Sequence, residues 1–134
     1  MPCGAHLFRG TWQVEYTDEF GAWWDTLGDD ERIRLTASVG LLERRGPSLP
    51  FPHSSGVGGS RHSHMRELRV QVGGRPLRVF YAFDPHRAAI LLIGGDKTGR
   101  DDFYVRLIPL ADRLYDEHLA EVAAEAAREQ DYGR

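Results

Sequence analysis

The chain has 134 residues, 41% hydrophobic and 28% charged, with a formal net charge of −3, which is typical of one soluble globular domain. No apolar run approaches the roughly 20 residues of a membrane-spanning helix, and residues 1–10 lack the apolar segment of a secretory signal. The single cysteine, Cys3, cannot form an internal disulfide, so we expect a cytoplasmic protein that makes no contact with membranes.

The first third of the chain predicts a strand followed by two helices. Residues 1–10 show no periodic pattern and are expected to be frayed, whereas residues 12–16 alternate apolar and polar as a strand does. Thr17 is a suitable N-cap for a short helix that Gly28 ends, and residues 29–45 predict a second helix. We expect its apolar stripes to be Ile33, Ala37 and Leu41 on one line, with Leu35, Val39 and Leu42 beside it.

The remainder predicts a long loop, three strands and a helix. Residues 46–64 are rich in Gly, Pro and Ser and predict a loop, of a length that is commonly functional. Antiparallel strands are predicted at residues 65–72, 76–83 and 88–95. Pro109 fits the first turn of a C-terminal helix, and residues from about 124 to 134 are expected to fray.

These elements predict an α+β fold formed by a single domain over residues 1–134. An N-terminal strand and a helical hairpin would pack on one face of a small antiparallel sheet, with a helix at the C-terminus. The other face of the sheet would then be available for a ligand.

The turn between the first two of these strands predicts their register. If Gly73-Gly74 are the two turn residues, Arg69 lies directly opposite Arg78, and opposed like charges destabilise a sheet. An anion such as a phosphate would remove the repulsion, and so would an Arg–Glu–Arg network through Glu67; the pattern leaves both readings open. We also expect Phe80, next to this pair, to be exposed and to suit a protein partner.

Charge is unevenly distributed along the chain. Residues 61–100 carry eight basic and three acidic side chains, net +5, whereas residues 1–60 and 107–134 are net negative. Because a polyanion responds to the local field, this segment indicates nucleic-acid binding. A chance fluctuation on a solvated surface is the alternative interpretation.

RNA can be cleaved without a metal when its own 2′-hydroxyl is the nucleophile. Arginine can stabilise the charge of the transition state, and Lys, His or Tyr can transfer protons. The candidates for proton transfer are Lys97, His62, His118 and Tyr104, although His118 also fits a packing role in the C-terminal helix. No cysteine or carboxylate accompanies the histidines at zinc-ligand spacing, so we predict no metal and no cofactor.

Several motifs, in this order, resemble the RelE/HigB-like toxins of type II toxin–antitoxin systems, in the branch of phage-derived addiction-module toxins. They are Gly59-Ser-Arg-His62, Met65-Arg-Glu-Leu-Arg69, Leu77-Arg-Val-Phe-Tyr81, Gly94-Gly-Asp-Lys97 and Ile108-Pro-Leu-Ala-Asp-Arg-Leu-Tyr-Asp-Glu-His118. The chain departs from the usual family pattern at Phe51, at His64 and at Arg66, where relatives often have arginine, asparagine and lysine.

The resemblance implies a RelE-like fold and an mRNA interferase, a metal-independent endoribonuclease that cuts mRNA on the ribosome and inhibits translation. A cognate helix-turn-helix antitoxin would neutralise the toxin and would be its only link to operator DNA. Taken with the residues, it predicts catalytic roles for Arg69, Arg78, Lys97 and Tyr104, and RNA binding by Arg61, His62, Arg66 and Arg100. Two alternatives remain: a ParE-like toxin that poisons gyrase, and an inactive toxin that acts as an antitoxin-bound co-repressor.

Overall fold

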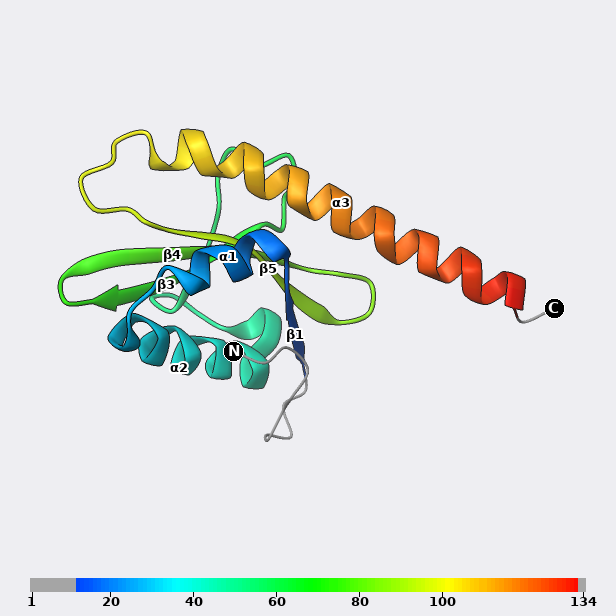
Figure 1. Ribbon diagram of the computed structural model, residues 1–134, viewed down its shortest axis with the longest axis horizontal. Coiled ribbons are helices and arrows are strands. Elements are labelled where there is room, and N and C mark those ends of the chain that lie inside the picture. Colours follow the sequence, from blue (N-terminus) through cyan, green and yellow to red (C-terminus); the bar gives the residue numbers. More distant parts are fainter. Residues whose placement is uncertain (1–11, 133–134) are drawn as a thin grey trace.

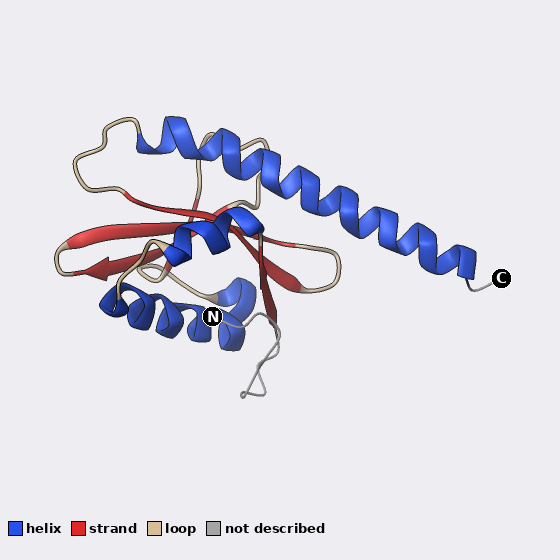
Figure 2. Ribbon diagram, viewed as in Figure 1, coloured by secondary structure: helices blue, strands red, loops and turns tan. Residues whose placement is uncertain are grey.

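The computed structural model describes residues 12–132 and places a five-stranded sheet between two helical layers (Figures 1 and 2). The elements are β1 (Gln13–Tyr16), α1 (Asp18–Asp25), α2 (Asp29–Arg45), the 3-10 turn η1 (Gly46–Ser48), β2 (Ser54–Gly56), β3 (Arg66–Val72), β4 (Arg75–Phe83), β5 (Ala88–Asp96) and α3 (Phe103–Tyr132). The sheet order is β1-β5-β4-β3-β2, with β1 parallel to β5 and the other pairs antiparallel. The predicted α+β class is confirmed, while Cys3 and the expected fraying of residues 1–10 lie outside the described residues.

The helical hairpin begins at Asp18 and ends at Arg45, as the sequence predicts, but α1 ends at Asp25 rather than at Gly28, which caps the start of α2 instead. The hydroxyl of Thr17 accepts a hydrogen bond from the Phe20 N–H at 3.0 Å and donates to the Leu92 carbonyl at 2.7 Å. This cap therefore both starts α1 and attaches it to β5. The Gly28 N–H donates to the Glu31 carboxylate at 2.7 Å, which stabilises the start of α2.

One face of the sheet packs against α1 and α2. Leu35, Val39 and Leu42 of α2 are buried there, with Phe20 of α1. The other predicted stripe was wrong at two of its three positions, because Ile33 is 67% exposed and Ala37 is also exposed, while Leu41 is half-buried. The large side chains at 35, 39 and 42 already form a helical stripe, and only one such stripe can face the sheet.

The opposite face is not free, contrary to the sequence prediction, because α3 covers it (Figure 1). This helix begins at Phe103, six residues before Pro109, and continues through residues 124–132, which were expected to fray. Phe80 lies under it with 0% exposure and stacks on Phe103 at 6.1 Å, so the expectation of an exposed Phe80 is also wrong. The C-terminal part of α3 projects beyond the sheet (Figure 1). Among the described residues, none of the helices combines the length and apolar character needed to cross a membrane.

The segment predicted to be one long loop contains a strand. Ser54–Gly56 forms β2 at the edge of the sheet and pairs with β3. From there the chain crosses to α3, where the Ser60 hydroxyl donates to Asp112 at 2.5 Å. This hydrogen bond therefore fixes the loop against α3.

Candidate nucleic-acid interface

The four residues predicted to be catalytic converge at one end of the sheet. The register of β3 and β4 is as predicted: Arg69 pairs with Arg78, and Gly73 and Gly74 form the turn with φ of 56° and 79°. Lys97 follows β5 directly, and Tyr104 lies in the first turn of α3. We call Arg69, Arg78 and Lys97, together with Glu67 and Tyr104, the arginine–lysine cluster.

A glycine makes this convergence possible. Gly95 pairs with Arg78 across β4 and β5. A Cβ at Gly95 would lie 2.9 Å from Phe103 and 3.0 Å from Leu107, so only glycine lets α3 approach the sheet this closely. This contact positions the neighbouring Tyr104 above the two arginine-bearing strands.

Glu67 is the centre of the cluster. Its carboxylate is 3.5 Å from Arg69 Nη1 and 3.8 Å from Arg78 Nε, and it accepts hydrogen bonds from Tyr104 at 2.8 Å and from Ser55 at 3.0 Å. The Arg–Glu–Arg network is thus present. The carboxylate lies between two guanidinium groups, and Lys97 adds a third positive charge beside Tyr104, so two positive charges remain in excess.

Arg78 is buried, although its face of the sheet was predicted to be available for a ligand. Its residue exposure is 5%, because α3 covers the face on which it lies. Nη1 donates to the Leu77 carbonyl at 3.0 Å. Its Nε is the single buried side-chain nitrogen or oxygen in residues 12–132 without a hydrogen-bond partner. An unsatisfied buried donor costs about 1–3 kcal/mol, so the site favours an added acceptor.

Tyr104 and Lys97 are in contact. The Lys97 ammonium lies 4.9 Å from the centre of the Tyr104 ring, within the range of a cation–π interaction. Burial, followed by the hydrogen bond to Glu67, raises the pKa of Tyr104 above its ordinary value, although the nearby Arg78 opposes this. At neutral pH the phenol therefore keeps its proton and can act as a proton donor.

All four of the predicted RNA-binding residues lie outside the cluster. Arg66 shares its side of β3 with Leu68, on the α1/α2 face, and its Nε donates to the Ser54 hydroxyl at 3.0 Å. Its position on the opposite face separates it from Arg69. Arg100 is exposed in the turn between β5 and α3, next to the cluster in sequence.

Arg61 and His62 bind carboxylates of α3 instead. Arg61 Nη2 donates to Asp116 at 2.6 Å, and His62 Nε2 is 2.8 Å from the other oxygen of the same carboxylate. The hydrogen bonds from Arg61 and then His62 lower the pKa of Asp116. Asp112 is buried and accepts from Ser60 and from the Arg61 backbone N–H. The sequence analysis missed both carboxylates, although their i, i+4 spacing places them on one helix face.

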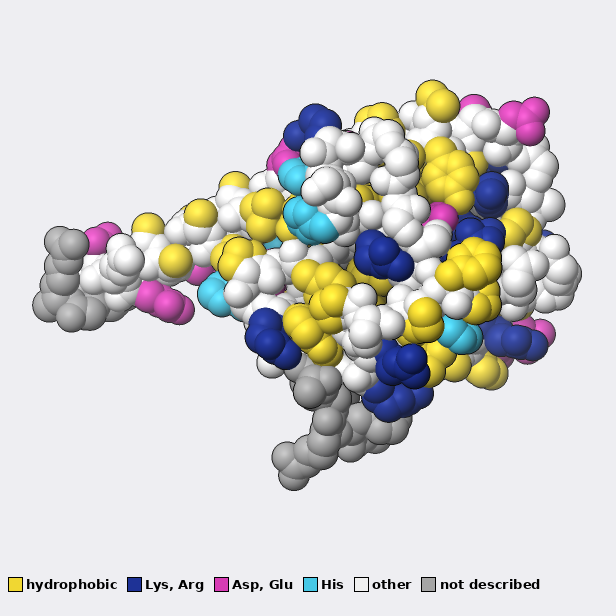
Figure 3. All heavy atoms as spheres, turned by 180° about the vertical axis from the view of Figure 1, so that it is seen from behind, with side chains coloured by type: hydrophobic (Ala, Val, Ile, Leu, Met, Phe, Trp, Pro, Cys, Tyr) yellow, Lys and Arg dark blue, Asp and Glu magenta, His cyan; other side chains and the backbone are white. Residues whose placement is uncertain are grey.

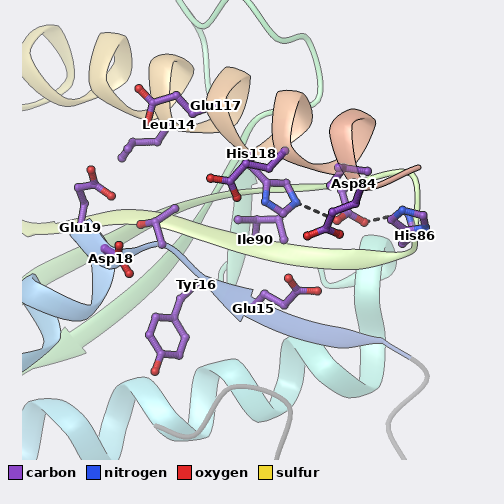
Figure 4. Close-up of a pocket in the computed structure, with 14 residues that line it drawn as sticks. Glu15, Tyr16, Asp18, Glu19, Asp84, His86, Ile90, Leu114, Glu117 and His118 are labelled. Atoms are coloured by element: carbon purple, nitrogen blue, oxygen red, sulfur yellow. Dashed lines mark hydrogen bonds and ion pairs between the residues drawn. The ribbon is translucent and has the colours of Figure 1, made fainter. Parts of the chain in front are cut away.

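His118, a candidate for proton transfer, has a structural role. It lies 2.9 Å from the buried Asp84, and Figure 4 shows the two side chains pointing toward each other. Burial opposes ionisation of Asp84, but the hydrogen bonds from His118 and from the backbone N–H groups of Ala88 and His86 outweigh it and lower its pKa.

The cavity of about 380 Å³ around this pair is strongly acidic. Its acidic lining comprises Glu15, Asp18, Glu19, Asp84, Glu117, Glu121 and Glu125. An RNA phosphate would be repelled here. Seen from behind, Lys and Arg side chains gather on the broad part of the molecule, while the projecting part of α3 shows Asp and Glu but neither Lys nor Arg on that face (Figure 3).

No group of three or more His, Cys, Asp or Glu side chains within residues 12–132 is arranged to hold a metal ion. The cluster that the structure does assemble is cationic, and cations of this kind stabilise negative charge directly.

Comparison with known proteins identifies one matching family and two similar proteins. The family described as "Phage derived protein Gp49-like (DUF891)" matches residues 22–116. A Mycobacterium tuberculosis protein named "Putative toxin HigB2" is 40% identical over 106 residues, which cover 78% of this chain and 53% of that protein. A second from the same organism, "Putative toxin HigB3", is 40% identical over 99 residues, covering 73% of this chain and 85% of that protein. The chain therefore spans about half the length of the first relative and most of the second.

Proposed function

Since this chain belongs to the Gp49-like family of phage-derived proteins, we propose that it is the HigB-like toxin of a toxin–antitoxin system and that it cleaves mRNA on translating ribosomes. The names of the two relatives support the first part of this proposal. The arginine–lysine cluster supports the second, since it offers excess positive charge to a phosphate.

The observation that carries the nuclease proposal is the state of Arg78. Arg78 is a buried guanidinium that faces Arg69 across the sheet, and its Nε makes no hydrogen bond. Glu67, its ion-pair partner at 3.8 Å, is too distant to accept one, so an added anion would meet an unused donor. A phosphodiester supplies both the acceptor oxygens and the negative charge. Arginine suits this role because its planar donors match the geometry of phosphate.

The proposed reaction uses the 2′-hydroxyl of the substrate as nucleophile. The 2′-hydroxyl gives up its proton to a base or to water as its oxygen attacks phosphorus, the bond from phosphorus to the 5′-oxygen breaks, and the leaving oxygen takes up a proton. The products are a 2′,3′-cyclic phosphate and a 5′-hydroxyl. Arg69 and Arg78 bind the scissile phosphate and stabilise its transition state, Lys97 adds charge or transfers a proton, and Tyr104 is placed to protonate the leaving oxygen.

The partners follow from the same proposal. A cognate helix-turn-helix antitoxin would neutralise the toxin in the cytoplasm and would alone connect it to operator DNA. The ribosome would present the mRNA, with Arg100 beside the cluster to extend the contact to RNA. Arg61 and His62 would contribute less charge than expected, because Asp116 already binds both.

The test is brief induction of the protein in a bacterial host, followed by primer extension on abundant mRNAs. We expect growth arrest with new 5′ ends inside coding regions, and their loss in Arg69→Ala. Arg66→Ala is the matched control, because it removes an arginine from the same strand but from the opposite face, and it should cleave as wild type does. Arrest with intact transcripts would contradict the proposal. DNA damage in that case would favour gyrase poisoning, and absence of any growth effect would favour the inactive co-repressor.

A further inference from the structure

A second feature lies next to the arginine–lysine cluster, on the outer flank of α3. A groove of about 600 Å³ runs between this helix and residues 58–61. Val105, Ile108 and Pro109 form its apolar helix wall, and Gly59 faces them from the loop. Gly59 has a φ of 88°, which favours glycine, and a Cβ there would lie 3.9 Å from Ile108. Because Gly59 has no side chain, no atoms project from this part of the loop into the groove.

The groove is open to solvent and exposes apolar surface. Val105 is 77% exposed, the most exposed of the large hydrophobic side chains in the described part of the chain. The volume of the groove lies within the range of roughly 300–1,000 Å³ for small-molecule sites.

One end of the groove adjoins the arginine–lysine cluster, and the other lies at Arg61 and Asp112. Tyr104, at one end, belongs to the cluster, and Arg61, at the other, keeps 62% of its side chain exposed even while it contacts Asp116. The eight-residue rise along α3 from Tyr104 to Asp112 is about 12 Å. The groove is therefore a short apolar stretch between the arginine–lysine cluster and the Arg61–Asp116 ion pair, with the buried Asp112 at that second end.

Pro109 also leaves a polar atom on this wall. Within α3 the N–H of residue 109 would donate to the carbonyl of Val105, but proline has no N–H. The Val105 carbonyl thus lacks its ordinary helical donor, at a position where both residues border the groove. An apolar wall beside a backbone carbonyl that has lost its i+4 donor suits a nucleobase, which has flat apolar faces and amino or imino donors at its edge.

We propose that this groove binds one nucleobase of the RNA strand, adjacent to the phosphate held by the arginine–lysine cluster. This inference rests on the proposed function and extends it, because it assigns base contact and therefore sequence preference to α3 and residues 58–61. Continuity with the cluster through Tyr104 favours RNA over an apolar side chain of the antitoxin as the occupant.

The first test compares Val105→Asp with Ile33→Asp. Both replace an exposed aliphatic residue of a helix by a carboxylate, but Ile33 lies on α2, on the other side of the sheet. Cleavage of a reporter mRNA is followed in a translating extract, and cut sites are sequenced. Val105→Asp should cleave about tenfold more slowly or more, the usual cost of losing one base contact, with an altered base preference at the cut. Ile33→Asp should match wild type.

The outcomes separate the two proposals. If wild type does not cleave, the proposed nuclease function fails and this inference falls with it. If wild type cleaves and Val105→Asp has the same rate and base preference, only the base site is overturned. If Val105→Asp cleaves normally but no longer co-purifies with the antitoxin, the groove is an antitoxin site and the inference is again wrong.

A binding measurement does not depend on turnover. A 2′-deoxy trinucleotide, which cannot be cleaved, is titrated into the full chain with labelled methyl groups. We expect shifts at Val105 and Ile108 and none at Ile33, and weaker shifts with a trinucleotide that lacks its central base. Equal shifts with the abasic trinucleotide would overturn the assignment of the groove to a base.

Discussion

Replacement of Arg78 by alanine tests whether the cluster is an anion site. The change removes a hydrogen bond to the Leu77 carbonyl and an ion pair with Glu67, and it leaves space in a buried region. Removing one member of a buried ion pair costs about 3–5 kcal/mol when the other charge is left alone. Here Glu67 keeps Arg69, Tyr104 and Ser55 as partners, and the unsatisfied Nε also disappears. We therefore expect a loss of about 1–3 kcal/mol in unfolding free energy, which lowers Tm by about 3–10 °C.

The assay is thermal unfolding with and without inorganic phosphate at constant ionic strength. If phosphate binds the wild-type cluster with a Kd of about 5 mM, 50 mM phosphate adds about 1.4 kcal/mol of stability. Arg78→Ala should lose this increment, whereas Arg66→Ala, with the same change in charge, should retain it. The reasoning is refuted if Arg78→Ala responds to phosphate as wild type does, or if wild type does not respond at all.

Three further predictions concern single side chains. Lys97→Arg keeps the charge but cannot readily release a proton, so cleavage should fall while Tm stays near that of wild type; full activity would limit Lys97 to an electrostatic role. Tyr104→Phe removes only the hydroxyl that donates to Glu67. It should slow cleavage about 100-fold or more in single-turnover kinetics and lower the unfolding free energy by about 1 kcal/mol in urea unfolding. An unchanged cleavage rate would exclude proton donation by Tyr104. The pKa of Asp84 is lowered in the folded protein, so the stability that Asp84 contributes is present above its unfolded pKa of about 4 and is lost as pH falls below it. Asp84→Asn should therefore be less stable than wild type at pH 7 and should lose less stability between pH 4 and pH 2. Parallel curves of Tm against pH would contradict this.

Local rules predicted the elements whose ends depend on nearby residues. The Thr17 cap and the Gly73-Gly74 turn are short-range features, and the turn fixes the register that brings Arg69 opposite Arg78. The start of α3 was mispredicted because proline is tolerated at a helix start but does not require one. Here Pro109 lies inside α3, where proline costs about 3 kcal/mol or more, so the packing of the preceding turn of α3 on the sheet outweighs this cost.

Long-range contacts could not be read from the sequence. That α3 covers the second face of the sheet depends on Gly95 accepting Phe103 and Leu107, contacts that no local pattern indicates. The burial of Arg78 follows from that coverage. The alternation of β3, in contrast, was sufficient to place Arg66 away from Arg69, because one residue of offset reverses the side chain in a strand.

Residues 61–100 carry a net charge of +5, but the basic side chains of this segment do not all lie on one surface. Strand alternation sends Arg66 to the α1/α2 face, and Asp116 of α3 neutralises Arg61 at the far end of the groove. The remaining positive charge is concentrated in the arginine–lysine cluster at the end of the sheet, where three cations accompany one carboxylate. RNA affinity should therefore depend steeply on Arg69, Arg78 and Lys97 and weakly on the other basic residues of the segment. A salt titration of RNA binding can detect this, because each lost phosphate contact reduces the slope of log K against log salt by about 0.7 for a single strand.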